Sequence, residues 1–271
     1  MTRTAISPRL AIRIFFSTGD NLAPVDPSNA NQHRTWRVST VAETGSTNAD
    51  LLLAGEQGAA DGTVLRAEHQ TAGRGRLDRT WEAPPGANLL VSILLAPAGE
   101  RPHDVVRAVA LAAVRACRET CAVEVSLKWP NDLCVGTDKI AGILAQRGRR
   151  ADGSGDFVVV GIGVNVGWAP PGAASLSSAG WERPVTPAEL CDALLAELDA
   201  ALALGHDDLH ADYVAHLATL GQRVRIETAD AALVGTAEAV DAEGRIVVRG
   251  DDGNVSSFDT ADVVHLRPHE A

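Results

Sequence analysis

The stretch "NLLVSILLAP", residues 88–97, is a nearly continuous apolar run. Such a run is typical of a strand that is buried within a sheet. Strand-like and helix-like segments alternate around it, from Trp36 to about Leu217. The other strand-like segments are 36–44, 63–69, 123–130, 139–147 and 156–167, and the helix-like ones are 49–57, 103–121 and 186–204. This alternation predicts an α/β domain over residues 36–218.

Local signals place some boundaries within this domain. Thr186 is the expected N-cap of the helix at 186–204, with Glu189 three positions later, which is a capping box. A turn at 136–138 is expected to pair the strand at 139–147 with a neighbour. Residues 1–35 end in a segment rich in Pro, Asn and polar groups, so we expect them to form a flexible tail.

After Gly221 the pattern changes to about five short alternating runs that are separated by turns such as Ala-Glu-Gly at 242–244. These runs predict a small antiparallel β-barrel or sandwich over residues 219–271. The segment holds ten Asp or Glu residues against five Arg and no Lys. That balance argues against nucleic acid as its ligand.

The composition excludes several classes of protein. The chain has 271 residues and a formal net charge of −11, which argues against duplex DNA or an anionic membrane as the main partner. No apolar run approaches the roughly 20 residues that span a bilayer, and residues 1–16 do not read as a signal peptide. The four cysteines form no CxxC pair and no zinc pattern. We expect Cys117 and Cys121 to be half-buried hydrophobic residues in a protein of the reducing cytoplasm.

The stretch "GRGRLDRTW", residues 73–81, alternates glycine with arginine. Such a loop can bring backbone N–H groups and guanidinium forks close to one phosphate or carboxylate. A solvated linker would have the same composition, and the GxxxxGK[ST] phosphate loop is absent. By itself the stretch therefore indicates an anion site only weakly.

Four other motifs each have an ordinary structural explanation. "GSTN" at 45–48 suits a helix cap formed by Ser46 or Thr47, and "KWPND" at 128–132 suits a proline-fixed turn. Lys139 could be an exposed lysine beside a strand, and "GIGVNV" at 161–166 could be a strand that glycine weakens. Their joint occurrence in this order needs another explanation.

With these motifs, the chain resembles the biotin protein ligases. Members of that family show the same five motifs in the same order, and the resemblance spans residues 40–267. In this chain they are GSTN at 45–48, QTAGRGRLDRTW at 70–81, KWPND at 128–132, KIAGIL at 139–144 and GIGVN at 161–165. The resemblance implies a catalytic domain like that of class II aminoacyl-tRNA synthetases, followed by an SH3-like barrel. It implies the monofunctional form, without an N-terminal DNA-binding domain.

The resemblance also implies a reaction. Biotin and ATP would form biotinyl-5′-adenylate with release of pyrophosphate, and the biotinyl group would pass to one lysine of a carrier domain of an acetyl-CoA or acyl-CoA carboxylase. Magnesium would accompany ATP and be held mainly through phosphate. No tightly bound prosthetic group, nucleic acid or membrane is implied. The reacting anions repel each other, so the site must align them and neutralise their charge.

The family pattern implies roles for single residues. Ser46, Thr47 and Gln70 would contact the uncharged ring of biotin, and Asn48 would position that turn. Arg74, Gly75 and Arg76 would contact the carboxylate of biotin and the α-phosphate of ATP, and Lys139 would bridge that carboxylate and that phosphate. Asn131 and Asp132 would face the adenylate or Mg²⁺, and Asn165 would contact adenosine. The expected catalytic residues are Lys139, Arg76 and Asp132.

One position departs from the family pattern. Asp78 stands where the loop commonly has a third glycine, which is expected to alter loop closure. Trp81 is expected to pack the base of the loop rather than to contact ligand.

Three alternatives are weighed against a ligase. Lipoate–protein ligases share the fold, but their motifs differ around the arginine loop. A biotin-responsive transcriptional repressor would need a helix-turn-helix, and the residues before GSTN show no three-helix pattern and no basic recognition helix. A non-catalytic biotin-binding module would not need the three cations Arg74, Arg76 and Lys139 to hold a neutral ring.

Overall fold

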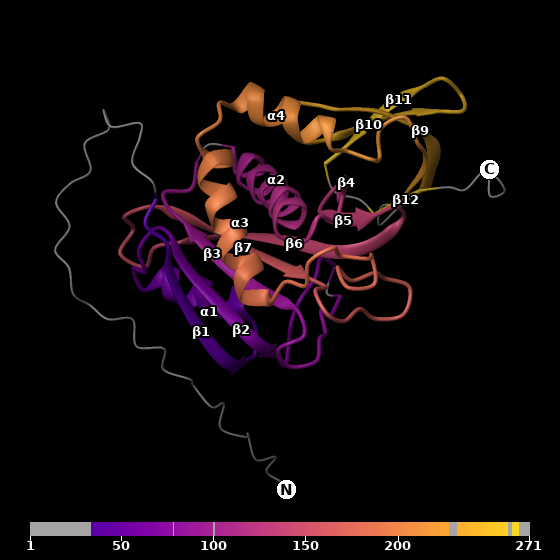
Figure 1. Ribbon diagram of the computed structural model, residues 1–271. Coiled ribbons are helices and arrows are strands. Elements are labelled where there is room, and N and C mark those ends of the chain that lie inside the picture. Colours follow the sequence, from indigo (N-terminus) through magenta and orange to yellow (C-terminus); the bar gives the residue numbers. More distant parts are fainter. Residues whose placement is uncertain (1–33, 78, 100, 228–231, 260–261, 266–271) are drawn as a thin grey trace, which may run out of the picture. The chain divides into compact units, whose positions relative to one another are not determined.

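The apolar run at 88–97 contains a central strand of a seven-stranded sheet in the computed structural model of the chain (Figure 1). The structure describes residues 34–77, 79–99, 101–227, 232–259 and 262–265. Apart from its last two positions, the tail predicted for residues 1–35 lies outside these ranges. The elements are β1 (Arg37–Thr44), α1 (Thr47–Glu56), β2 (Thr63–Gln70), β3 (Leu89–Leu95), α2 (Pro102–Cys121), β4 (Ser126–Lys128), β5 (Asp132–Val135), β6 (Asp138–Arg149), β7 (Asp156–Val164), α3 (Pro187–Leu202), α4 (His206–Ala215), β8 (Arg223–Glu227), β9 (Ala232–Val240), β10 (Ile246–Gly250), β11 (Val255–Phe258) and β12 (Asp262–His265).

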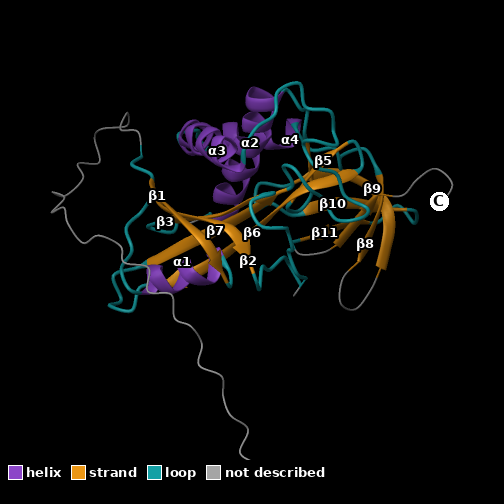
Figure 2. Cartoon of the chain, turned by 60° about the horizontal axis from the view of Figure 1, so that its bottom comes forward, coloured by secondary structure: helices purple, strands orange, loops and turns teal. Residues whose placement is uncertain are grey.

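The first sheet has the strand order β1-β2-β3-β7-β6-β5-β4. Strands β1 and β2 run parallel, and all other neighbours are antiparallel. Helix α1 packs on one face, against β2, β3, β6 and β7, whereas α2 and α3 pack together on the other face (Figure 2). Because both faces are covered, every residue of β3 is buried, as its apolar sequence predicts.

The second sheet is antiparallel and has the order β11-β10-β9-β8-β12. It confirms the five short strands predicted after Gly221. Both sheets belong to one compact unit, Arg34–Ala271. The proposed boundary between residues 218 and 219 falls between the two sheets, just before β8.

The structure confirms some local predictions and corrects others. Helix α3 begins with the expected capping box, in which the Glu189 N–H donates to Thr186 Oγ1 at 3.2 Å and the Thr186 N–H donates to the Glu189 carboxylate at 2.8 Å. The 136–138 turn joins β6 to β5, a strand that the sequence reading missed, and α4 was missed as well. Cys117 and Cys121 are fully buried rather than half-buried, because α2 is covered by α3 as well as by the sheet. None of the described helices is long and apolar enough to cross a bilayer.

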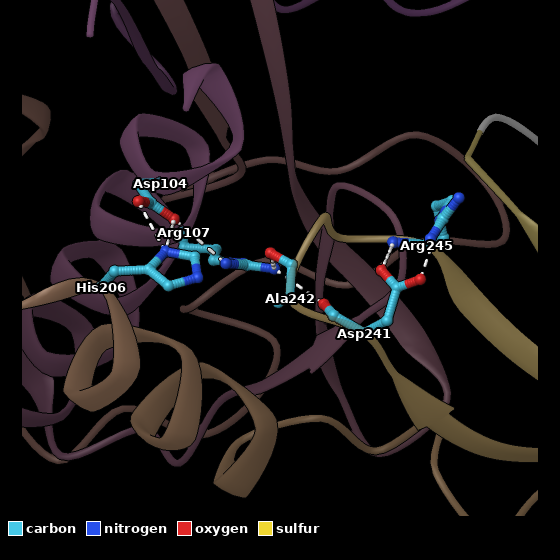
Figure 3. A network of polar contacts seen from close by, with 6 residues as sticks. All are labelled: Asp104, Arg107, His206, Asp241, Ala242 and Arg245. Carbon is cyan, nitrogen blue, oxygen red and sulfur yellow. Dashed lines mark hydrogen bonds and ion pairs between the residues drawn. The ribbon is translucent and has the colours of Figure 1, made fainter. Parts of the chain in front are cut away.

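A buried arginine joins helix α2 to the second sheet (Figure 3). Arg107 of α2 is 2% exposed and donates to the backbone carbonyls of Asp241 and Ala242, at 3.2 and 3.0 Å, in the turn between β9 and β10. Its other end donates to Asp104 at 3.0 Å, and that carboxylate lies 2.9 Å from His206 Nδ1. A buried charge is tolerated only when it is fully paired and hydrogen-bonded. This network therefore fixes the second sheet on α2.

We expect Arg107→Ala to lower the free energy of unfolding by about 3–5 kcal/mol, because two backbone carbonyls lose their donor and Asp104 keeps only His206 as a partner. Urea denaturation monitored by circular dichroism measures the change. Arg225→Ala, which removes an exposed arginine of β8, should stay within about 0.5 kcal/mol of the wild type. Equal unfolding midpoints for the two variants would contradict this role for Arg107.

Candidate active site

One pocket of about 460 Å³ brings the five motifs together. Five cationic side chains and three carboxylates line it, so its lining is positive in a chain whose net charge is −11. Its volume is in the usual range for a site that encloses a small organic ligand. The pocket thus has the size and the charge for an anionic small molecule.

The floor of the pocket is one row of residues across five neighbouring strands. Strand register places Lys128 opposite Asp132, Asp132 opposite Gly142, Gly142 opposite Gly163, and Gly163 opposite Leu90. All five residues line the pocket. The row therefore changes from apolar on β3, through glycine on β7 and β6, to charged on β5 and β4.

The end of the pocket near α1 is neutral. The backbone N–H and the hydroxyl of Thr47 both donate to Gln70 Oε1, at 2.8 and 2.9 Å. Ser92 Oγ lies 2.7 Å from Thr47 Oγ1 and donates to Asn48 Oδ1 at 2.6 Å. Ser46 is the N-cap of α1 but its side chain makes no capping hydrogen bond, so the helix-cap interpretation of these hydroxyls is wrong. The polar groups of the motif line the pocket instead.

Asn48 holds this neutral end to the sheet. Its Nδ2 donates to the Leu144 carbonyl at 3.1 Å and to Gln146 Oε1 at 3.0 Å. Gly161 makes room for the side chain, because a Cβ at that position would overlap Asn48 Oδ1. The expected positioning role of Asn48 agrees with these contacts.

The arginine loop folds back on itself. The backbones of Arg74 and Thr80 pair in an isolated antiparallel β-bridge. The Gly75 N–H donates to the Arg79 carbonyl at 2.7 Å. Arg76 Nη1 donates to Asn131 Oδ1 at 3.2 Å, which connects the loop to the KWPND segment. Asp78 lies outside the described residues. Arg74, Gly75 and Arg76 all line the pocket, and their contacts with carboxylate and phosphate stay a prediction.

Trp81 both anchors the loop and lines the pocket. Its N–H donates to the Gly73 carbonyl at 3.0 Å, which agrees with the expected place at the loop base. Its indole lies on the glycines of the floor, since a Cβ at Gly163 would overlap the ring. The indole Nε1–H is buried and has no hydrogen-bond partner among the described residues. Trp81 therefore lines the pocket with its ring as well as anchoring the loop, and this second role was not expected from the sequence.

Lys139 is the central cation of the pocket. Its Nζ lies 2.6 Å from Asp132 Oδ1 and 5.6 Å from the centre of the Trp81 ring. The side chain is 38% exposed and faces the pocket, so the interpretation of Lys139 as a lysine that merely flanks a strand is not needed. Nearby, burial raises the pKa of the Cys134 thiol to about 11, so this cysteine stays protonated and is no nucleophile at neutral pH.

Asn131 and Asn165 have structural contacts. Asn131 Nδ2 donates to the Ile143 carbonyl at 2.8 Å, so this amide links the Arg76 side chain to β6. Asn165 lines the pocket but is 2% exposed. Its Oδ1 accepts a hydrogen bond from Asn88 and its Nδ2 donates to the Ala174 carbonyl, at 3.1 and 3.0 Å. The geometry therefore favours a supporting role for Asn165 over direct contact with adenosine.

Several lining residues were given no role from the sequence, among them Ser92, Lys128, Glu227 and Val263. Ser92 is the one polar side chain within β3, and Lys128 opens the KWPND motif, so both carried a signal in the sequence. Glu227 and Val263 come from the second sheet. No local pattern marks them, because the docking of that sheet brings them to the pocket.

Comparisons with known proteins agree with this geometry. The sequence model of the "Biotin/lipoate A/B protein ligase family" matches residues 42–165, and that of the "Biotin protein ligase C terminal domain" matches residues 219–266. The chain is 40% identical over 253 residues to a biotin–[acetyl-CoA-carboxylase] ligase of Mycobacterium tuberculosis, covering 86% of this chain and 90% of the relative. It is 34% identical over 235 residues to the Paracoccus denitrificans protein of the same name, covering 79% and 94%.

The fold is similar to that of a solved structure as well. The chain superimposes on the biotin protein ligase of Aquifex aeolicus, in complex with biotin and ATP, with a TM-score of 0.73 and 23% identity. The match covers 84% of this chain and 99% of that chain.

Proposed function

The chain belongs to the biotin protein ligase family, and from that premise we propose that it activates biotin with ATP and transfers it to a lysine of a biotin carboxyl carrier domain of an acyl-CoA carboxylase. The observation that carries the proposal is the single pocket that joins the neutral GSTN end to Arg74, Arg76 and Lys139. Biotin has an uncharged ring and an anionic tail, which match the neutral end and the cationic end of the pocket. The free, buried cysteines support a cytoplasmic location.

In the first step a carboxylate oxygen of biotin attacks the α-phosphorus of ATP, and the bond to the β-phosphate breaks so that pyrophosphate leaves. Ser46, Thr47 and Gln70 hold the ring, and Arg74, Gly75 and Arg76 cover the carboxylate and phosphate. Lys139 lies between these anions and offsets the charge that develops as they approach. In the second step the amine of the acceptor lysine attacks the activated carbonyl, and AMP leaves.

The pocket suits a magnesium ion that is bound mainly through the phosphates of ATP. The described residues contain no group of three or more His, Cys, Asp or Glu that could form a protein cage for a metal. Asp132 offers one carboxylate at the charged end, paired with Lys139 at 2.6 Å. Mg²⁺ usually binds through one or two carboxylates together with substrate phosphates. We propose that Asp132, next to Asn131, would hold the ion together with the phosphates of ATP, and that a bound ion would offset the negative charge of those phosphates.

Mass spectrometry after incubation with Mg-ATP and either biotin or lipoate tests the proposal. A biotinyl adenylate, followed by biotinylation of a purified carrier domain, is the expected result. An adenylate formed with lipoate alone would assign the protein to lipoate ligation instead.

We expect Gly161→Ala to raise the KM for biotin by about tenfold or more with a smaller effect on the KM for ATP. The added methyl overlaps Asn48 Oδ1, so Asn48 and the adjoining turn must move. Initial rates of pyrophosphate release measure both constants. Gly99→Ala is the matched control, because a Cβ at Gly99 meets no atom within 4 Å. An unchanged KM for biotin in Gly161→Ala would remove Asn48 from the biotin site.

A further inference from the structure

Lys128 has no place in the reaction as described so far, although its side chain lines the same pocket as Lys139. Within the described part of the chain, its ammonium forms no hydrogen bond or ion pair. By contrast, Lys139 is paired with Asp132, and Arg76 donates to Asn131. A half-buried ammonium in a pocket for anionic substrates is suited to bind an anionic group of a ligand.

The distribution of lysine in the chain supports a ligand-binding role for Lys128. Of its 24 basic residues two are lysines, Lys128 and Lys139, and both line the pocket. Elsewhere the chain uses arginine for its positive charges. An ammonium is a compact point charge with three rotatable donors, whereas a guanidinium is a planar fork. The two lysines of this chain therefore both lie at the pocket for which an anionic ligand is proposed.

The backbone on both sides of Lys128 is held firmly. The Leu127 N–H donates to the His216 carbonyl, and the Ala218 N–H donates to the Leu127 carbonyl, both at 2.8 Å. The Trp129 N–H donates to Thr219 Oγ1 at 3.0 Å, and its indole donates to the Gly244 carbonyl at 2.9 Å. Gly244 lies two residues after Ala242, whose carbonyl accepts a hydrogen bond from Arg107. The junction of the two sheets thus fixes the strand that carries Lys128.

The order of strands places Lys128 at the end of the pocket that is opposite the neutral, biotin-binding end. The neutral groups lie on β2, β3 and the start of α1, Asp132 with its partner Lys139 lies farther along the sheet, and Lys128 lies beyond it on β4. The carboxylate nucleophile extends from the ring at the neutral end. In a displacement at phosphorus the attacking and leaving oxygens are roughly in line. The leaving group therefore departs toward β4.

We propose that Lys128 binds the β- and γ-phosphates of ATP and the pyrophosphate that leaves, while Lys139 serves the carboxylate and the α-phosphate. The attacking carboxylate oxygen forms a bond to the α-phosphorus, and pyrophosphate takes the electron pair of the broken bond. The ammonium of Lys128 offsets that charge and keeps its own proton. This assignment rests on the proposed function.

Steady-state kinetics of Lys128→Gln test the assignment. Loss of a charge-assisted contact should raise the KM for Mg-ATP about tenfold or more, with the KM for biotin unchanged. Pyrophosphorolysis of preformed biotinyl-5′-AMP should slow by a similar factor. Transfer of biotin from that synthetic adenylate to a carrier domain should proceed at the wild-type rate, because the adenylate lacks the β- and γ-phosphates.

Two comparison variants complete the test. Lys128→Arg keeps the charge and should recover part of the ATP affinity, and Arg225→Gln removes an exposed arginine of β8 and should leave both KM values unchanged. An unchanged KM for ATP in Lys128→Gln, or an equal rise in the KM for biotin, would overturn the assignment. If the wild-type protein forms no biotinyl adenylate, the proposed function itself fails, which is a separate outcome.

Discussion

Replacement of Lys139 by alanine should slow the formation of biotinyl adenylate by about 10²-fold or more, the loss that follows removal of one charge-stabilising donor from an active site. Two effects act together. The ammonium that would offset the two reacting anions is lost, and the negative charge of Asp132, which lies 2.6 Å from Lys139 Nζ, is no longer offset by that ammonium. Pyrophosphate release and mass spectrometry of the adenylate measure the rate.

The variant should remain folded, because the side chain of Lys139 is 38% exposed. Arg147→Ala is the matched control, since it removes a cation from the same strand whose partner, Asp156, lies away from the pocket. Near-normal adenylate synthesis by a folded Lys139→Ala protein would show that the lysine does not act on the reacting groups.

Much of the fold follows from local sequence. The apolar run of β3, the alanine-rich helix α2 and the capping box of α3 each carry their signal within a short window. Helix α4 was missed because "HDDLHADYVA" is short and mostly polar, and it buries only Leu209 and Tyr213. Strand β5 was missed because its four residues directly follow a proline turn.

The site was predictable where a motif is contiguous and unpredictable where a contact joins distant segments. Lys139 and the arginine loop belong to recognisable motifs, so their meeting in one pocket was expected from the resemblance. The contacts of Asn48 with Ser92 and Leu144 join residues that are 44 and 96 positions apart. Arg107 reaches Asp241, 134 positions away. Such pairs depend on how the sheets and helices pack, which no local pattern encodes.

The second half of the reaction depends on retention of the adenylate, and Arg76 is the residue for which we expect the clearest effect. A mixed anhydride reacts with any lysine that it meets, so the site must stay closed until the acceptor arrives. Arg76 belongs to the loop and contacts Asn131 of the opposite segment at 3.2 Å. It can therefore close the loop over the adenylate and contact phosphate at the same time.

We expect Arg76→Gly to form the adenylate but to release it. Loss of a charge-assisted contact to phosphate of about 1.5–3 kcal/mol weakens retention roughly 10–150-fold. Synthesis continues because Lys139 and its partner Asp132 remain in the variant. The expected sign is biotinylation of bystander lysines when the variant is incubated with biotin, Mg-ATP and excess albumin, detected by blotting for biotin.

Arg74→Gly is the informative comparison, because Arg74 lies in the same loop and lines the same pocket. Release from Arg76→Gly alone would show that retention depends on the bridge between the loop and Asn131. Release from Arg74→Gly alone would assign the clamp to the other arginine and contradict the role of Arg76. In each case adenylate formation, measured by pyrophosphate release, must be retained, since a variant that makes no adenylate has none to lose. The two readouts together separate a residue that holds the intermediate from one that helps to form it.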